Sequence, residues 1–213
     1  MGTDPRDKYK KVKYEQILPY VLPYVNGCPP EIAEHNIRLA AIEFLSYTKL
    51  ITSTMYLDAQ EGVSDYFLEG DYDSECYCVS SIKSVCINSR DLERIDRDTC
   101  CPTDCGFTFC MPCDLYIQPA PCSDAARCIE VQVYLQPTQD GCSIDSWVYE
   151  KYAEALANGA LSRLYNLTRQ PWYDPSQAGL HAAFFDRVKK RARCLATNKH
   201  TTGKTFIKTK RWC

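Results

Sequence analysis

The sequence has 213 residues, 45% of them hydrophobic and 24% charged, which is the composition of a folded protein and not of a disordered chain. No apolar run approaches the roughly 20 residues that a membrane helix needs, and the charged start, MGTDPRDKYKKVKYEQ, lacks the apolar core of a secretory signal. We therefore expect a protein of formal net charge −2 that is made in the cytosol, stays soluble and has no membrane partner.

Residues 1–54 are expected to form an N-terminal arm followed by a first helix. The stretch YEQILPYVLPYVNG is interrupted twice by proline, which favours an extended arm with buried aromatic side chains. A Pro-Pro pair then opens the helix, because proline is tolerated in a first helical turn. Apolar residues recur at helical spacing from Ala33 to about Leu50.

Residues 55–142 are expected to form a β-rich insertion. The run CIEVQVYL, residues 128–135, alternates apolar and polar side chains as a half-buried strand does. DLYIQP, residues 114–119, and SIKSVCIN, residues 81–88, show the same pattern more briefly. The short polar link PCSDAAR predicts that 114–119 and 128–135 pair as a β-hairpin.

Two further helices are predicted within residues 143–200. The first begins near Ile144, and Gly159 on it would let a neighbouring helix approach closely. Asp174 starts the second, because an N-cap Asp followed by Pro at the first position and Gln at the third is a variant of the capping box. His181 is interpreted as a histidine at the edge of the core, not as a ligand.

Residues 201–213 form a β-prone tail that is expected to dock on a partner. Residues 187–213 contain ten Lys and Arg side chains and no Asp or Glu, whereas residues 1–186 carry a net charge of −12. This polarity favours self-association or docking on an acidic partner, with nucleic acid as the competing interpretation. The predicted docking residues are Lys204, Phe206, Ile207, Lys208, Lys210, Arg211 and Trp212.

The predicted fold class is α+β. In detail, we expect a three-helix body that carries a cysteine-rich antiparallel β insertion and ends in the β-prone C-terminal tail.

Eleven of the 14 cysteines lie between Cys76 and Cys142, five of them in the stretch CCPTDCGFTFCMPC. An even count, a loop-rich setting and the absence of nearby histidines favour disulfides, whose pairing the sequence leaves open. Cys86 and Cys128, in strand-like runs, are interpreted as small buried apolar residues. The disulfide candidates are Cys76, Cys78, Cys100, Cys101, Cys105, Cys110, Cys113, Cys122 and Cys142, and Cys213 is the candidate for a bridge between subunits.

Two metal sites are the alternatives to disulfides. Cys101, Cys105, Cys110 and Cys113 could supply four zinc ligands. The spacing Cys105-x4-Cys110-x2-Cys113 also matches a plant-type iron–sulfur site with Cys142 as the distant ligand, although bulky residues fill the loop. The sequence contains no GxSxG, no HExxH and no convincing carboxylate pair, so we expect neither an enzyme nor a cofactor.

Three segments follow one another in a familiar order. ILPYVLPYVNGCPPEIAEHNIRLAAIEFL comes first, a β-rich insertion ending in a strand and Pro137 comes next, and YEKYAEALANGALSRLYNLTRQPWYDPSQAGLHAAFFDRVKKRA comes last. This order resembles the head–tail adaptor proteins of tailed bacteriophages, also called connector, neck or head-completion proteins. The resemblance covers nearly the whole chain, and the cysteine-loaded insertion departs from the usual pattern.

The resemblance implies a structural virion protein that forms a ring between the portal of the capsid and the tail. Its partners would be further copies of the chain in a ring of twelve, the portal protein, tail or neck proteins, and genomic DNA that passes through without sequence readout. The protein would be made in the bacterial host cytoplasm and work at the head–tail junction of the virion, where disulfides persist. A cysteine-rich metal-binding module and a nucleic-acid binder that uses the basic C-terminal segment remain the rival hypotheses.

Overall fold

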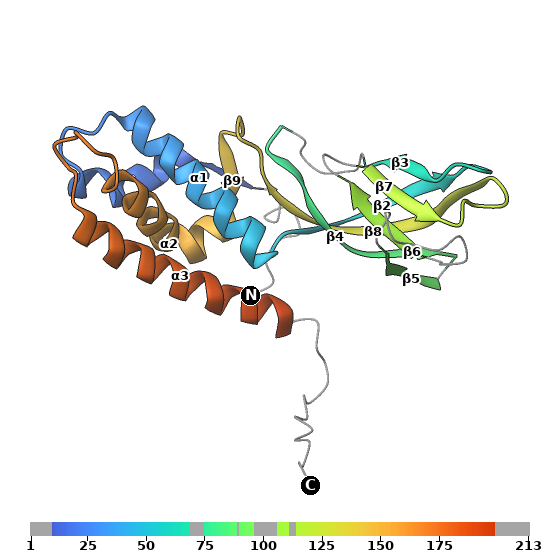
Figure 1. Ribbon diagram of the computed structural model, residues 1–213. Helices are drawn as coiled ribbons and strands as arrows, with labels where there is room; N and C mark the ends of the chain where they lie inside the picture. Colours follow the sequence, from blue (N-terminus) through green and yellow to red (C-terminus); the bar gives the residue numbers. More distant parts are fainter. Residues whose placement is uncertain (1–9, 69–74, 89, 96–105, 111–113, 199–213) are drawn as a thin grey trace, which may run out of the picture.

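The computed structural model describes residues 10–68, 75–88, 90–95, 106–110 and 114–198. The molecule is elongated, with the helices gathered at one end and a curled β-sheet at the other (Figure 1). None of the described helices combines the length and the apolar character that crossing a membrane requires.

In the described part of the chain, three α-helices and two short 3₁₀ segments make up the helical end. They are η2 (Tyr14–Tyr20), η3 (Leu22–Tyr24), α1 (Pro30–Thr48), α2 (Ser146–Leu164) and α3 (Pro175–Asn198). Pro30 occupies the first position of α1, where the missing N–H costs nothing. Lys49 ends α1 in the left-handed conformation, with a φ of 54°.

The predicted start of α3 is confirmed. The Asp174 carboxylate accepts hydrogen bonds from the backbone N–H groups of Ser176 at 3.0 Å and Gln177 at 3.2 Å. It also accepts one from the Ser176 hydroxyl at 2.6 Å. The Ser176 hydroxyl and the two backbone N–H groups lower the pKa of Asp174, so the cap is occupied by a carboxylate at neutral pH.

The predicted close approach at Gly159 is also confirmed. A Cβ atom on Gly159 would lie 2.9 Å from the Cβ of Ala40 on α1 and 3.0 Å from the Phe185 ring on α3. Phe44 packs beside them, with its ring centroid 4.9 Å from that of Tyr152 and 6.1 Å from that of Phe185. The three α-helices therefore meet around one glycine of α2.

The predicted extended arm is wrong, because residues 14–24 form η2 and η3. Four of the arm's buried side chains lie three or four residues apart, which is helical spacing: Tyr14, Ile17, Val21 and Val25. Tyr14 is buried as expected, but Tyr20 and Tyr24 are exposed. Burial of the apolar residues on one side outweighs the interruption by the two prolines.

The sheet has seven strands in the order β2-β8-β4-β5-β6-β7-β3. They are β2 (Thr52–Ala59), β3 (Asp65–Phe67), β4 (Tyr77–Ile87), β5 (Arg90–Arg94), β6 (Gly106–Cys110), β7 (Asp114–Gln118) and β8 (Ala125–Pro137). The consecutive strands β2 and β3 occupy the two edges, so the sheet curls (Figure 1). A separate antiparallel pair, β1 (Lys11–Lys13) and β9 (Ser143–Asp145), lies next to the helices.

The predicted architecture is wrong in detail, although α+β describes the fold broadly. The sheet is a large, curled half of the molecule, not a small insertion into a three-helix body. It is also mixed and not antiparallel, because β5 and β6 run parallel, with Glu93 opposite Gly106. Alternation along single strands indicated their existence but carried no information about strand direction.

The predicted hairpin between 114–119 and 128–135 is wrong as well. β7 pairs with β6 and β3, whereas β8 pairs with β2 and β4. The strands themselves lie where alternation placed them, and Ile129, Val131, Val133 and Leu135 are all buried. The 13-residue β8 is a central strand because it has apolar partners on both sides.

Candidate functional site

The outer face of α3 is an uncovered surface of the helical end. Ala178, Phe185, Ala192 and Ala196 bury the inner face against α1 and α2. On the opposite side, Leu180 is 65% exposed and Leu195 is 51% exposed. Arg187 and Arg191 are exposed between these two leucines at helical spacing. We call Leu180, Arg187, Arg191 and Leu195 the outer stripe.

Exposed aromatic residues gather near the start of α3. A groove of about 490 Å³ is lined by Pro19, Tyr20, Pro23 and Tyr24 from the arm, by Glu154 and neighbouring residues of α2, and by His181 of α3. Tyr24 is 60% exposed. Such a concentration of exposed aromatic and proline surface is typical of protein–protein contacts. We call this hollow the aromatic groove.

His181 is held in place at the base of the aromatic groove. Its Nδ1 lies 2.7 Å from Oδ1 of Asn158. The Tyr165 ring stacks on the imidazole with centroids 5.5 Å apart, and the Tyr24 ring meets it edge-on at 6.3 Å. Burial lowers the pKa of His181, so the imidazole is neutral at pH 7. This setting agrees with the interpretation of a core-edge histidine.

A cluster of charges links the three α-helices. The Glu43 carboxylate on α1 accepts hydrogen bonds from Arg163 of α2 at 2.6 Å and from Lys189 of α3 at 2.5 Å. Asp186 lies 2.9 Å from the same Lys189 ammonium. Burial opposes ionisation of Glu43, but the two hydrogen bonds outweigh it and lower its pKa. We call these four residues the ion cluster.

A second polar junction attaches the β1–β9 pair to the sheet. Lys11 lies 2.8 Å from the Asp145 carboxylate and 4.0 Å from the centre of the Tyr77 ring. The backbone N–H of Asp145 donates to the Tyr77 hydroxyl at 3.1 Å. Burial raises the pKa of Tyr77 and of the nearby Tyr14. Both phenols are therefore neutral and act as fixed parts of the scaffold.

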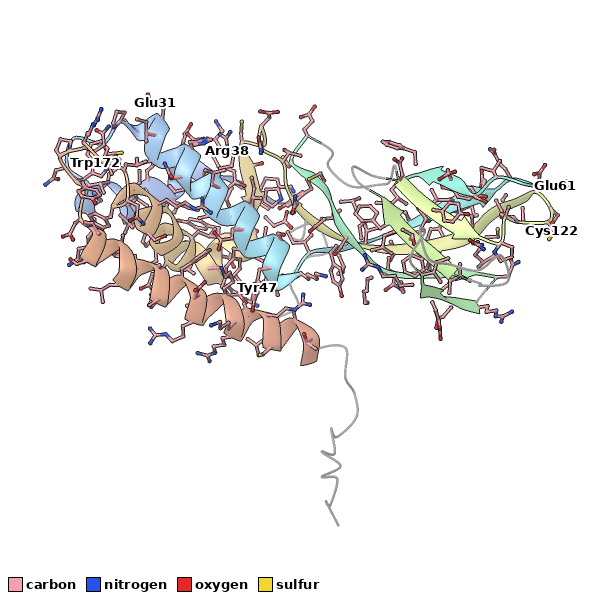
Figure 2. All side chains as sticks on the ribbon, in the orientation of Figure 1. Glu31, Arg38, Tyr47, Glu61, Cys122 and Trp172 are labelled. Carbon is pink, nitrogen blue, oxygen red and sulfur yellow. The ribbon has the colours of Figure 1, made fainter. Side chains whose placement is uncertain are left out.

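The predicted disulfide candidates are spread along the sheet end. Cys76 is half-buried, with Sγ 3.2 Å from the Ser143 hydroxyl, and Cys78 is half-buried on β4. Cys122 is exposed at the tip of the sheet farthest from the helices (Figure 2), and Cys142 is exposed before β9. No disulfide joins two of the cysteines that the structure describes. Bridges to the other cysteines of the insertion stay a prediction.

The remaining cysteine candidates fall on parts that the structure does not describe. Cys100, Cys101, Cys105, Cys113 and Cys213 lie outside the described residues, and so does the side chain of Cys110. The zinc and iron–sulfur sets draw on these positions and stay alternatives. Within the described ranges, no three His, Cys, Asp or Glu side chains gather as ligands of one metal ion.

Cys86 and Cys128 are half-buried on the neighbouring strands β4 and β8. Cys128 packs against the hydrophobic core, as interpreted, whereas Cys86 makes a polar contact. The Cys86 thiol donates to the Asp91 carboxylate at 2.6 Å. This hydrogen bond raises the pKa of Cys86 to about 11, with smaller contributions from burial and nearby carboxylates. The thiol is therefore protonated and unreactive at neutral pH.

Sequence reasoning missed the ion cluster. Lys189 lies four residues after Phe185 and three before Ala192, and both of these neighbours are buried in the helix interface. A lysine on an otherwise apolar helix face is the signal that indicates a buried partner. Nothing in the sequence identified Glu43 as that partner.

All the predicted docking residues of the C-terminal tail, Lys204 to Trp212, lie outside the described residues, so tail docking stays a prediction. The outer stripe and the aromatic groove are the candidate assembly surfaces of the described chain. A scan of the sequence against protein-family models and a search of curated proteins found no match.

Proposed function

We propose that the protein is a structural subunit of a bacteriophage head–tail junction that assembles into a closed ring between portal and tail. The observation that carries the proposal is the outer stripe, an uncovered helix face that combines Leu180 and Leu195 with two exposed arginines. Exposed leucines beside exposed arginines on one helix face are compatible with a protein–protein contact, in which apolar residues and Arg are common. The order of the segments along the chain supports the choice of a head–tail adaptor.

A second copy of the chain is the cover that fits the outer stripe. Residues 1–186 carry a net charge of −12, so a copy offers the acidic surface that Arg187 and Arg191 need. Glu150 and Glu154 are exposed on α2, and Glu154 lines the aromatic groove. Contact between two different surfaces of the same chain is heterologous, and such contacts generate rings when the rotation closes.

The proposal includes the other partners that the resemblance implies. The ring would have twelve subunits, contact the portal and a tail or neck protein, and let DNA pass without sequence readout. The basic C-terminal tail would dock on a neighbour, and bridges among the insertion cysteines would stabilise the mature particle without a metal. No enzymatic turnover is part of this function.

A nucleic-acid binder is the second candidate, because the same exposed arginines favour phosphate contacts. The two candidates differ in what a charge exchange does. Reversing Arg187 and Arg191 would weaken either function. A compensating reversal on α2 would restore only contact between copies of the chain.

We therefore propose a charge-swap experiment. The variant Arg187→Glu with Arg191→Glu should lower the mass of the assembly measured by light scattering, and adding Glu150→Lys with Glu154→Lys should restore it. Phe67→Ser on β3, an exposed apolar residue of the sheet end, is the matched control and should assemble normally. Unchanged assembly of the double-reversal variant would contradict the proposed interface.

A further inference from the structure

A basic cavity lies where the helical end meets the sheet. It has a volume of about 210 Å³ and is lined by Thr48, Lys49, Lys83, Tyr134, Arg193 and Thr197. These residues come from the end of α1, from β4 and β8 of the sheet, and from the last turns of α3. Tyr47 directly precedes the lining residue Thr48, and Figure 2 shows it on the side of α1 that faces α3.

Three half-buried cations, Lys49, Lys83 and Arg193, line the cavity. Each of them contacts a neutral group. The Lys49 ammonium lies 5.0 Å from the centre of the Tyr134 ring. Lys83 donates to Oε1 of Gln132 at 2.9 Å, and Nη1 of Arg193 donates to the Tyr47 carbonyl at 3.3 Å. Among the described residues, none of the three cations forms an ion pair with a carboxylate.

Among the residues that the structure describes, the nearby carboxylates do not neutralise this charge. Glu43 lines the adjoining hollow, but it is bound to Arg163 and Lys189. Glu130 accepts a hydrogen bond at 3.2 Å from Nε2 of Gln132, the residue whose Oε1 accepts from Lys83. Partly buried charges without a counter-charge are costly, because the surroundings replace water poorly.

The cations also act on one another. Burial lowers the pKa of Lys49, and the charges of Arg193 and of Arg94 on β5 lower it further. Lys49 lies at the C-terminal end of α1, where the negative end of the helix dipole stabilises a cation. The dipole does not account for Lys83 on β4 or Arg94 on β5. The cluster as a whole is therefore suited to an anion.

Both threonine hydroxyl groups of the lining are already engaged. Thr48 donates to the Phe44 carbonyl at 2.7 Å, and Thr197 donates to the Arg193 carbonyl at 3.0 Å. The charged donors of the lining are the ammonium groups of Lys49 and Lys83, each with protons to spare, and the guanidinium of Arg193. Charged donors that approach from three elements match an anion whose oxygens point in several directions.

We propose that the basic cavity binds a phosphate group through Lys49, Lys83 and Arg193. A tetrahedral phosphate presents an oxygen to each cation, whereas a planar carboxylate presents two oxygens along one edge. Free inorganic phosphate and the phosphodiester backbone of DNA have this chemistry in common, and the experiment separates them. Binding here does not depend on ring assembly.

The first arm measures binding of inorganic phosphate to the full chain by calorimetry, in chloride of constant ionic strength. Wild type should bind, and Lys49→Gln and Lys83→Gln should each bind roughly tenfold more weakly or worse, since each loses a charge-assisted contact. Lys190→Gln removes an exposed charge from α3 outside the cavity and should bind like wild type. Arg193→Gln replaces either site variant that fails to fold.

The second arm measures the fluorescence anisotropy of labelled duplex DNA with the same proteins. Weaker DNA binding by the site variants, with Lys190→Gln unchanged and phosphate competing, identifies the DNA backbone as the source. Phosphate binding that needs the site while DNA binding does not identifies free phosphate. The inference is overturned if wild type binds no phosphate, if acetate binds equally well, or if Lys190→Gln loses as much affinity as the site variants. A chain that binds phosphate but forms no ring would contradict only the proposed function.

Discussion

Lys189 on α3 donates a hydrogen bond to Glu43 on α1 at 2.5 Å. Arg163 on α2 donates to the other oxygen of the same carboxylate at 2.6 Å, so a single acidic side chain links three helices. The outer stripe lies on the same helix as Lys189. The ion cluster therefore helps to fix the orientation in which α3 presents its uncovered face.

Glu43→Ala should lower the free energy of unfolding by about 1 kcal/mol, because it leaves the buried Lys189 ammonium without its main partner. The value is small because the Glu43 side chain is 41% exposed. Urea denaturation followed by circular dichroism measures the change. Lys151→Ala, at an exposed position of α2 outside the ion cluster, is the control and should stay within about 0.5 kcal/mol of wild type. Equal effects of the two substitutions would contradict a stabilising role for the ion cluster.

The ion cluster also predicts how stability depends on pH. Hydrogen bonds lower the folded-state pKa of Glu43 below its ordinary 4.5, so its contribution is complete above that pH and is lost as the pH falls through the folded pKa. Hydrogen bonds raise the pKa of Lys189 above 10.5, so its contribution is lost as the pH rises through that higher pKa. As the pH is lowered from 7 through the folded-state pKa of Glu43, the thermal unfolding midpoint of Glu43→Gln should fall less than that of wild type. Parallel curves for both proteins would count against this account.

Two helical glycines should respond to alanine in opposite directions. Gly159→Ala places a Cβ atom 2.9 Å from the Cβ of Ala40, and this overlap should cost about 1–3 kcal/mol. The higher helix propensity of alanine offsets part of that cost, so the net effect should be a lower free energy of unfolding. Gly179, on α3, has nothing within 4 Å of its added Cβ, so Gly179→Ala should stabilise by about 0.5–1 kcal/mol. Denaturation midpoints of the two variants test the pair. A stabilising Gly159→Ala would show that α1 and α2 are not closely packed there.

The helices could be predicted from the sequence because their signals are local. Asp174 and the residues after it determine a cap within one turn, and the small residue Gly159 marks the helix crossing. The pairing of β7 and β8 could not be predicted in this way. Alternation reports one buried face per strand, and the choice of neighbour depends on contacts between distant segments.

The basic cavity was invisible in the sequence for a related reason. Lys49 and Lys83 are ordinary surface residue types, separated along the chain and brought together only where the end of α1 meets β4. The 3₁₀ conformation of residues 14–24 was not predicted, because the two prolines favour an extended chain. The spacing of Ile17, Val21 and Val25, all buried, indicated the helical alternative. The composition of residues 187–213 predicted a basic segment. It did not predict that Arg187 and Arg191 would lie together on one exposed helix face.

The Cys86 thiol should react slowly with iodoacetamide at pH 8. Its pKa is raised to about 11 by the hydrogen bond to Asp91, so little thiolate is present. Asp91→Asn should speed alkylation of Cys86, measured by peptide mass spectrometry, and should leave the rate at the exposed Cys122 unchanged. Rapid alkylation of Cys86 in the wild type would mean that the Asp91 contact does not persist in solution.

Negative-stain electron microscopy of the purified full chain, joined to native mass spectrometry, tests the proposed ring most directly. The account predicts closed rings with a central channel and a mass of twelve copies of the 24.3 kDa chain. The double reversal of Arg187 and Arg191 is the matched control and should yield smaller species. A monodisperse monomer of the wild-type chain in both measurements would contradict the central claim.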